Sequence, residues 1–134
     1  MIYLLDTNVL SEWWKPQPEP AVSAWLESAE WFLTAPVIAE IQEGAEADAS
    51  QARRAQINAK LDQLLKEQPV GVLEWDAETA RTWGRLKHSA EAKRQPAPLW
   101  DSLLDALAVR HGATIATRNE KDFRHATTFN PWTA

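Results

Sequence analysis

The chain has 134 residues, no cysteine and a formal net charge of −5. This length suits a single domain over residues 1–134, and the lack of cysteine excludes a disulfide framework, a thiolate metal site and a cysteine nucleophile. The apolar run at the N-terminus is too short to span a membrane and has no basic flank like that of a signal peptide. We therefore expect a cytoplasmic protein without a membrane segment.

The charges are distributed unevenly. Residues 1–50 carry a net charge of −8, and residues 51–134 carry +3. An acidic half and a mildly basic half can surround a site that binds cations and then a polyanion. A random scatter of solvated charges explains the same numbers equally well.

The first predicted strand is the apolar run at residues 2–5, which leads directly into Asp6, Thr7 and Asn8. A short apolar run before small polar residues is typical of a buried strand in a parallel sheet. Open α/β sheets bind ligands beyond the carboxyl ends of their strands, so Asp6 stands where such a fold places its chemistry. From this stretch alone, a helix N-cap is an equally good interpretation of Asp6.

Further strands and helices alternate along the chain. We expect strands at residues 31–34, 70–75, 114–117 and, at an edge, 127–129. We expect helices at residues 9–14, 21–29, 36–47, 51–68, 77–92 and 100–111. In the helix at 77–92, the spacing of Ala80, Trp83, Leu86 and Lys87 predicts the buried face. The alternation predicts an α/β fold, with a central parallel sheet of four or five strands between two layers of helices.

Acidic and amide side chains follow several of these strands. Asp6 follows the first, Glu40 lies on the helix after the second, Asp101 opens the last long helix, and Asn119 and Asp122 follow the fourth strand. The carboxyl ends of parallel strands share one edge, so these groups can converge. Clustered carboxylates repel one another, and oxygen ligands without cysteine select Mg²⁺ or Mn²⁺. Such ions activate water and stabilise phosphate charge, which predicts phosphodiester hydrolysis.

Each of these residues also has a simpler interpretation when it is considered alone. Glu40 fits a solvated helix residue, Asp101 fits an N-cap, and Asn119 and Asp122 fit turn formers. The prediction of a joint site depends on all of them reaching one sheet edge.

Four motifs stand in order along the chain: LLDTNVLSE at residues 4–12, VIAEI at 37–41, PLWDSLL at 98–104 and TRNEKDF at 117–123. Together they resemble the motif set of PIN-domain ribonucleases, and most closely the VapC/FitB toxin branch of type II toxin–antitoxin systems. WGRL at 83–86 and NPW at 130–132 are also similar to that branch. The resemblance covers nearly the whole chain.

The resemblance implies a three-layer PIN-like fold and an endoribonuclease that depends on Mg²⁺ or Mn²⁺. It also implies a homodimer and a cognate antitoxin, often a small DNA-binding ribbon-helix-helix protein. Asp6, Glu40 and Asp101 match the three acids that hold the metal. The fourth acid position falls at Asn119, as in related members with this motif, and Asp122 could supply a carboxylate from nearby.

Other residues are expected to contact the RNA. Thr7 matches a hydroxyl position beside the first acid, where it could reach the substrate phosphate, and we expect Asn8 to hold the loop that presents both. Arg85 and Arg118 are the first candidates to hold the RNA backbone. Exposed tryptophans, of which the candidates are Trp13, Trp14 and Trp100, could stack on bases, although core or dimer packing explains them better.

Asp105 departs from the family pattern, which usually has a small apolar residue there. It lies one turn after Asp101 on the same helix face. It either points into the metal site or pairs with a base such as Arg110, and we favour the second interpretation.

Two alternative functions share this fold. A metal-binding module that holds a partner without catalysis is compatible with Asn119, and a DNA or flap-type nuclease would use the same chemistry. A phosphoacceptor domain would need an acid pair near the first strand, where this chain has one acid.

Overall fold

The computed structural model describes residues 1–67, 71–89 and 93–133. Its centre is a parallel sheet in the order β3-β2-β1-β4-β5. The strands are β1 (Tyr3–Leu5), β2 (Trp31–Thr34), β3 (Val72–Leu73), β4 (Thr114–Ala116) and β5 (Thr127–Phe129). Because β1 lies between β2 and β4, the residue after β1 stands at the middle of the carboxyl edge of the sheet. The structure confirms the predicted α/β class and the parallel sheet.

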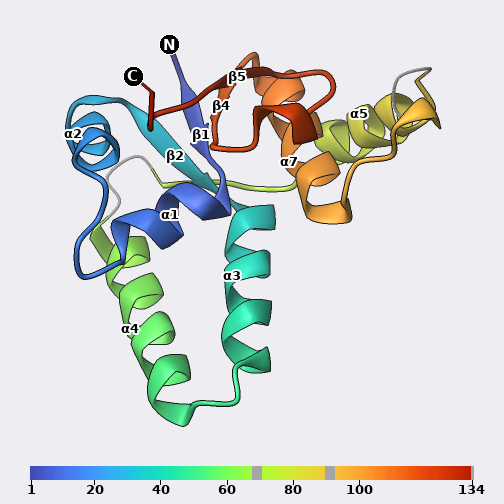
Figure 1. The fold of residues 1–134 in the computed structure, drawn as a ribbon. Coiled ribbons are helices and arrows are strands. Elements are labelled where there is room, and N and C mark those ends of the chain that lie inside the picture. The colour runs from blue at the N-terminus through green and yellow to red at the C-terminus, as the bar shows by residue number, and fades with distance from the viewer. Residues whose placement is uncertain (68–70, 90–92, 134) are drawn as a thin grey trace.

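Helices connect the strands. They are α1 (Thr7–Trp13), α2 (Pro20–Ser28), α3 (Ala35–Ala47), α4 (Gln51–Glu67), α5 (Ala77–Lys87) and α7 (Leu99–His111), with a 3₁₀ turn η1 (Glu120–Asp122) before β5. In Figure 1, α3 and α4 form a hairpin that extends away from the sheet, while α5 and α7 pack together elsewhere on it. None of the helices in the described residues is long and apolar enough to cross a membrane.

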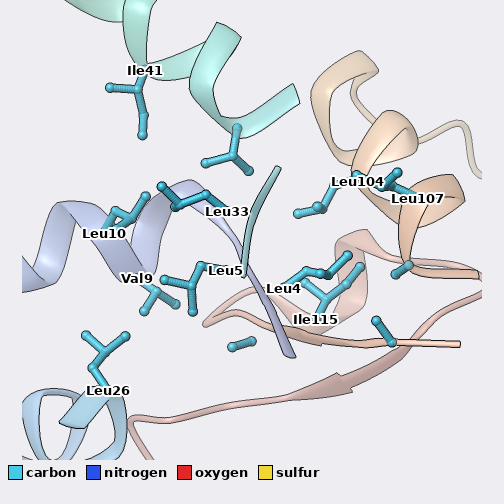
Figure 2. Packing of buried hydrophobic residues seen from close by; sticks show 14 of the residues in the cluster. Leu4, Leu5, Val9, Leu10, Leu26, Leu33, Ile41, Leu104, Leu107 and Ile115 are labelled. Carbon is cyan, nitrogen blue, oxygen red and sulfur yellow. The ribbon is translucent and has the colours of Figure 1, made fainter. Parts of the chain in front are cut away.

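The core fixes β1 from both faces. Leu4 and Leu5 are fully buried, and successive strand residues point to opposite sides of a sheet. Figure 2 shows Leu4 on the side of Leu107 of α7 and Leu5 on the side of Val9 of α1. Each buried leucine contributes roughly 1.5–3 kcal/mol relative to an exposed one. This packing holds Asp6, the next residue, in a defined place.

The predicted buried face of α5 was wrong at two positions. Ala80 and Lys87 are exposed, whereas Thr79 and Thr82 are buried. The two threonines can be buried because their hydroxyls donate locally, to Asp76 Oδ1 at 2.7 Å and to the Glu78 carbonyl at 2.9 Å. Apolar spacing alone cannot reveal polar side chains that are satisfied in this way.

Most other boundaries lie within two residues of the predictions, but β3 is shorter than the predicted 70–75 and α5 ends at Lys87 rather than at residue 92. α1 begins at Thr7 rather than at residue 9, because Asp6 caps it. Gly112 ends α7 in the left-handed conformation at φ 62°, where a residue without Cβ is favoured. The predicted parts of elements at residues 68–70 and 90–92 lie outside the described residues.

Candidate active site

Asp6 is both a helix cap and a site residue by position. Its Oδ1 accepts the N–H of Thr7 at 2.8 Å, which makes it the N-cap of α1. Its Oδ2 accepts the Thr117 hydroxyl at 2.8 Å and the Asn8 amide at 3.2 Å. A carboxylate can accept about four hydrogen bonds, so these three leave capacity for a further ligand. The cap and the site interpretations therefore do not exclude each other.

Asn8 ties the end of β1 to the end of β4. Its Nδ2 donates to the Thr117 hydroxyl oxygen at 3.3 Å, and its Oδ1 accepts the N–H of Arg118 at 3.3 Å. The same Thr117 oxygen accepts the N–H of Asn119 at 3.0 Å. These bonds confirm the expectation that Asn8 holds the loop around Asp6, and they fix the start of the segment that carries Arg118 and Asn119.

Glu40 reaches the same edge from α3. This helix begins directly after β2 with Pro36 in its first turn, and Glu40 is half-buried in the second turn. The Thr7 hydroxyl donates a hydrogen bond to Glu40 Oε1. Thr7 thus connects the first two acids of the predicted set across neighbouring strands.

These residues line one cleft, which we call the acidic cleft. It is lined by Asp6, Thr7, Asn8, Ser11, Glu12, Lys15, Glu40, Asp101, Arg118, Asn119 and Trp132. The structure therefore brings together the three predicted metal-holding acids and, beside them, Thr7, Arg118 and Asn119. Asp122 lies close enough to affect the acids electrostatically, although it is not a lining residue.

Arg85, a predicted contact to the RNA backbone, and two of the tryptophans considered for stacking on bases lie outside the lining of the acidic cleft. Arg85 is exposed on α5 and lies outside that lining, and its guanidinium is 3.4 Å from the Thr82 hydroxyl. Trp13 packs edge-on against Trp31 with ring centroids 5.9 Å apart, and Trp14 is half-buried against the core. For these two tryptophans the packing interpretation was the better one.

The pKa of Asp101 is raised by its surroundings. Partial burial and the nearby carboxylates of Asp6, Asp122 and Glu40 raise the pKa of Asp101 to about 7. The pKa of Asp6 is also raised, mainly by burial, although the hydrogen bonds from Thr117 and Thr7 oppose that effect. The cleft therefore holds more negative charge than its own cations balance, which favours a bound cation.

The donor set fits a hard divalent cation. Within the described residues, no three acidic or histidine side chains form a ready-made ligand cage. Mg²⁺ does not require such a cage, because it keeps several waters and takes one or two carboxylates together with substrate phosphates. Asp6, Glu40 and Asp101 offer carboxylate oxygens in one cleft, so they are the residues that could hold the ion.

Four lining residues escaped the sequence reasoning: Ser11, Glu12, Lys15 and Trp132. Glu12 is buried and accepts from Lys15 Nζ at 3.0 Å and from the N–H of Glu19 at 3.0 Å, and these bonds lower its pKa. Trp132 lies under the guanidinium of Arg118, whose Cζ is 5.2 Å from the ring centroid. The i,i+3 spacing of Glu12 and Lys15 could have revealed the first pair, whereas no local signal places Trp132 at the cleft.

Asp105 does not line the acidic cleft. Its Oδ2 lies 2.7 Å from His125 Nδ1, so the expected pairing with a base is found, but the suggested partner Arg110 was wrong. The partner comes from the segment before β5, which helix spacing could not predict.

Known proteins with similar sequences and folds place this arrangement in a family. The PIN-domain profile matches residues 3–128. VapC ribonuclease Y4jK of Sinorhizobium fredii is 33% identical over 96% of both chains, and toxin FitB of Neisseria gonorrhoeae is 31% identical over 96% of this chain and 97% of its own. The crystal structure of FitAcB from Neisseria gonorrhoeae superposes with a TM-score of 0.80, 30% identity and complete coverage of both chains. The chain therefore belongs to the PIN-domain family, together with proteins of the VapC and FitB type.

Proposed function

We propose that this protein is a metal-dependent endoribonuclease that hydrolyses RNA phosphodiester bonds and acts as the toxin of a type II toxin–antitoxin pair. The observation that carries the proposal is the convergence of Asp6, Glu40 and Asp101 in one cleft with Arg118 at its side. Relatives named as a ribonuclease and as a toxin support the same activity.

In this proposal, Asp6, Glu40 and Asp101 would hold Mg²⁺ or Mn²⁺. The ion would neutralise phosphate charge and make a bound water more acidic. Asp6 is preorganised by the N–H of Thr7 and the Thr117 hydroxyl, so it needs no rearrangement to offer its remaining capacity. A bound cation would favour the ionised carboxylate of Asp101, because a nearby positive charge stabilises that form.

The other cleft residues bind and orient the substrate. Arg118 approaches an RNA phosphate, and the Trp132 ring keeps its guanidinium plane in place. Thr7 offers its hydroxyl beside the first acid, while Asn119 and Asp122 orient the attacking water. Arg85, which lies outside the cleft lining, would hold the RNA backbone only further along the strand.

The partner in this proposal is an antitoxin, specifically a small DNA-binding protein of the ribbon-helix-helix class, and the toxin itself forms a homodimer in the cytoplasm. The solved structure of FitAB bound to a DNA fragment supports a DNA-binding partner, since it superposes with a TM-score of 0.77 at 29% identity. It covers 98% of this chain and 96% of its own.

Replacement of Asp6 by Asn tests the proposal. The amide oxygen can still cap Thr7, so we expect the far-UV circular dichroism spectrum to be unchanged. Loss of the carboxylate charge should abolish Mg²⁺-dependent cleavage of total RNA, as excess EDTA should with the wild type. Asp48→Asn, on a half-buried carboxylate that pairs with Arg53 outside the cleft lining, is the matched control and should cleave normally. Full activity of Asp6→Asn would refute the proposal.

The same assay separates the alternatives. Single-stranded and duplex DNA offered beside RNA identify a DNA nuclease. Growth arrest on expression that persists in Asp101→Asn would instead identify a partner-binding module without catalysis, the function that Asn119 in the fourth acid position favours.

A further inference from the structure

Asp105 is a buried carboxylate that the proposed chemistry does not use. Its side chain is 7% exposed, one turn after Asp101 on α7. Its Oδ1 accepts the N–H of Ala126 at 2.8 Å and that of His125 at 3.3 Å, while Oδ2 lies 2.7 Å from His125 Nδ1. Three donors of one short segment thus converge on one carboxylate. We call Asp105, His125 and Ala126 the Asp105 clamp.

The clamp reaches a third segment through the other nitrogen of His125. With Nδ1–H donating to Asp105, the neutral imidazole accepts at Nε2, and the Ser89 hydroxyl lies 2.9 Å from it. Ser89 follows the end of α5. His125 therefore joins α7, the end of α5 and the segment before β5.

The clamp closes the loop that carries several residues of the proposed site. Residues 117–126 connect β4 to β5 and include Arg118, Asn119 and Asp122. Asn8 and Thr117 hold the first end of this loop, beside Asp6. Asp105 holds the far end, three residues after Asp122, and it does so from the same helix that carries Asp101.

We propose that Asp105 and His125 are positioning residues, which fix the loop of Asn119 and Asp122 relative to Asp101 and so set the geometry of the acidic cleft. This inference rests on the proposed ribonuclease function for its effect on catalysis. Its effect on the loop itself does not depend on that function.

The chemistry of the clamp explains why a carboxylate stands there. The Asp105 side chain is only 7% exposed, so water does not readily replace it as an acceptor. A donor that is shielded from water and has no acceptor is costly, and Ala at this position would leave three part-buried donors without their acceptor. An Asn side chain still offers one oxygen to Ala126, and His125 can change tautomer to accept the new amide N–H. We therefore expect Asp105→Asn to restore part of what Asp105→Ala loses.

Amide hydrogen exchange of the full-length protein, without RNA or metal, tests the clamp directly. Asp105→Ala should raise the exchange rate of residues 118–124 by roughly tenfold or more, because the loop loses its attachment to α7. Thr128→Ala is the matched control, since it removes only an exposed hydrogen bond to Glu120 from the same part of the chain. If Asp105→Ala does not fold, His125→Gln and Asp105→Asn provide the same comparison. Unchanged exchange in these folded variants would overturn the proposal.

Kinetics test the effect on the site. Asp105→Ala should lower kcat by roughly 10–100-fold, the usual loss when residues that orient a metal site are replaced. KM should change much less, because Asn8 still holds Arg118. A merely structural role predicts lower thermal stability with normal kcat below the unfolding temperature, and that result would overturn the positioning role. If the wild type itself cleaves no RNA while the exchange result stands, the proposed function fails and the clamp remains.

The connectivity of Ser89, His125 and Asp105 is also that of a hydrolytic triad, in which serine is the nucleophile. Ser89→Ala separates the two roles. In a clamp, this variant keeps the Asp105 contacts, so RNA cleavage and loop exchange should stay close to wild type. Hydrolysis of p-nitrophenyl acetate that Ser89→Ala abolishes would overturn the positioning assignment.

Discussion

Asp101 and Asp105 lie one turn apart on α7 and have opposite surroundings. At Asp101, partial burial and then the facing carboxylates of Asp6, Asp122 and Glu40 raise the pKa to about 7. Asp105 faces three donors from His125 and Ala126. Both side chains are removed from water at least in part, so the difference lies in the groups that face them, which are carboxylates at Asp101 and hydrogen-bond donors at Asp105.

A carboxylate that faces other carboxylates favours a bound cation. A carboxylate whose oxygens accept hydrogen bonds from neighbouring donors instead stabilises the structure around it. Asp6 combines both roles, because its Oδ1 caps α1 while the residue also lines the acidic cleft. Residues of the first kind are expected to be expendable for folding and essential for catalysis. Residues of the second kind are expected to affect the fold or the position of the site.

The largest expected effect is that of Asp101→Asn. The substitution removes a ligand charge from the proposed metal site, so cleavage of RNA should fall by roughly a thousandfold, or about 4 kcal/mol in transition-state stabilisation. It also removes carboxylate repulsion, so the Tm of the metal-free protein should be equal to or higher than that of the wild type. Steady-state cleavage and thermal unfolding of the two proteins measure both effects. A lower Tm with retained cleavage would place Asp101 among the structural carboxylates.

The division between carboxylates of the proposed metal site and structural carboxylates could be predicted only in part from the sequence. The positions of Asp6, Glu40 and Asp101 were predictable because each residue follows a strand or lies near the start of a helix. Parallel strands end at one edge of the sheet, which brings these residues together. The partner of Asp105 was not predictable, because His125 reaches it only once the segment before β5 has packed against α7. Trp132 and the outward position of Arg85 depend on the same tertiary packing, which apolar spacing does not encode.

A smaller effect is expected on the pH dependence of stability. A carboxyl whose pKa is higher in the folded than in the unfolded state favours folding at low pH, and this contribution is lost as the pH rises from about 4 to about 7. The Tm of the metal-free wild type should therefore fall relative to that of Asp101→Asn over this range. Thermal unfolding in EDTA from pH 4 to pH 8 gives the difference. Added Mg²⁺ should recover the loss at pH 8, and a difference that does not vary with pH would contradict the repulsion at this site.

The smallest effect is expected at Asp76, which follows β3 much as Asp6 follows β1 and also caps a helix. Its Oδ1 accepts the N–H of Thr79 at 2.8 Å and the Thr79 hydroxyl at 2.7 Å, and these bonds lower its pKa. Asp76→Ala should lower the Tm by a few degrees at neutral pH, and this effect should vanish as the pH falls through the lowered pKa, where the wild-type carboxylate is protonated too. Cleavage of RNA should be unchanged, because Asp76 follows the edge strand β3 and lies outside the lining of the acidic cleft. A loss of cleavage comparable to that of Asp6→Asn would show that a capping carboxylate at the sheet edge also serves the site. Hydrogen bonds accepted from nearby donors would then no longer distinguish structural acids from catalytic ones.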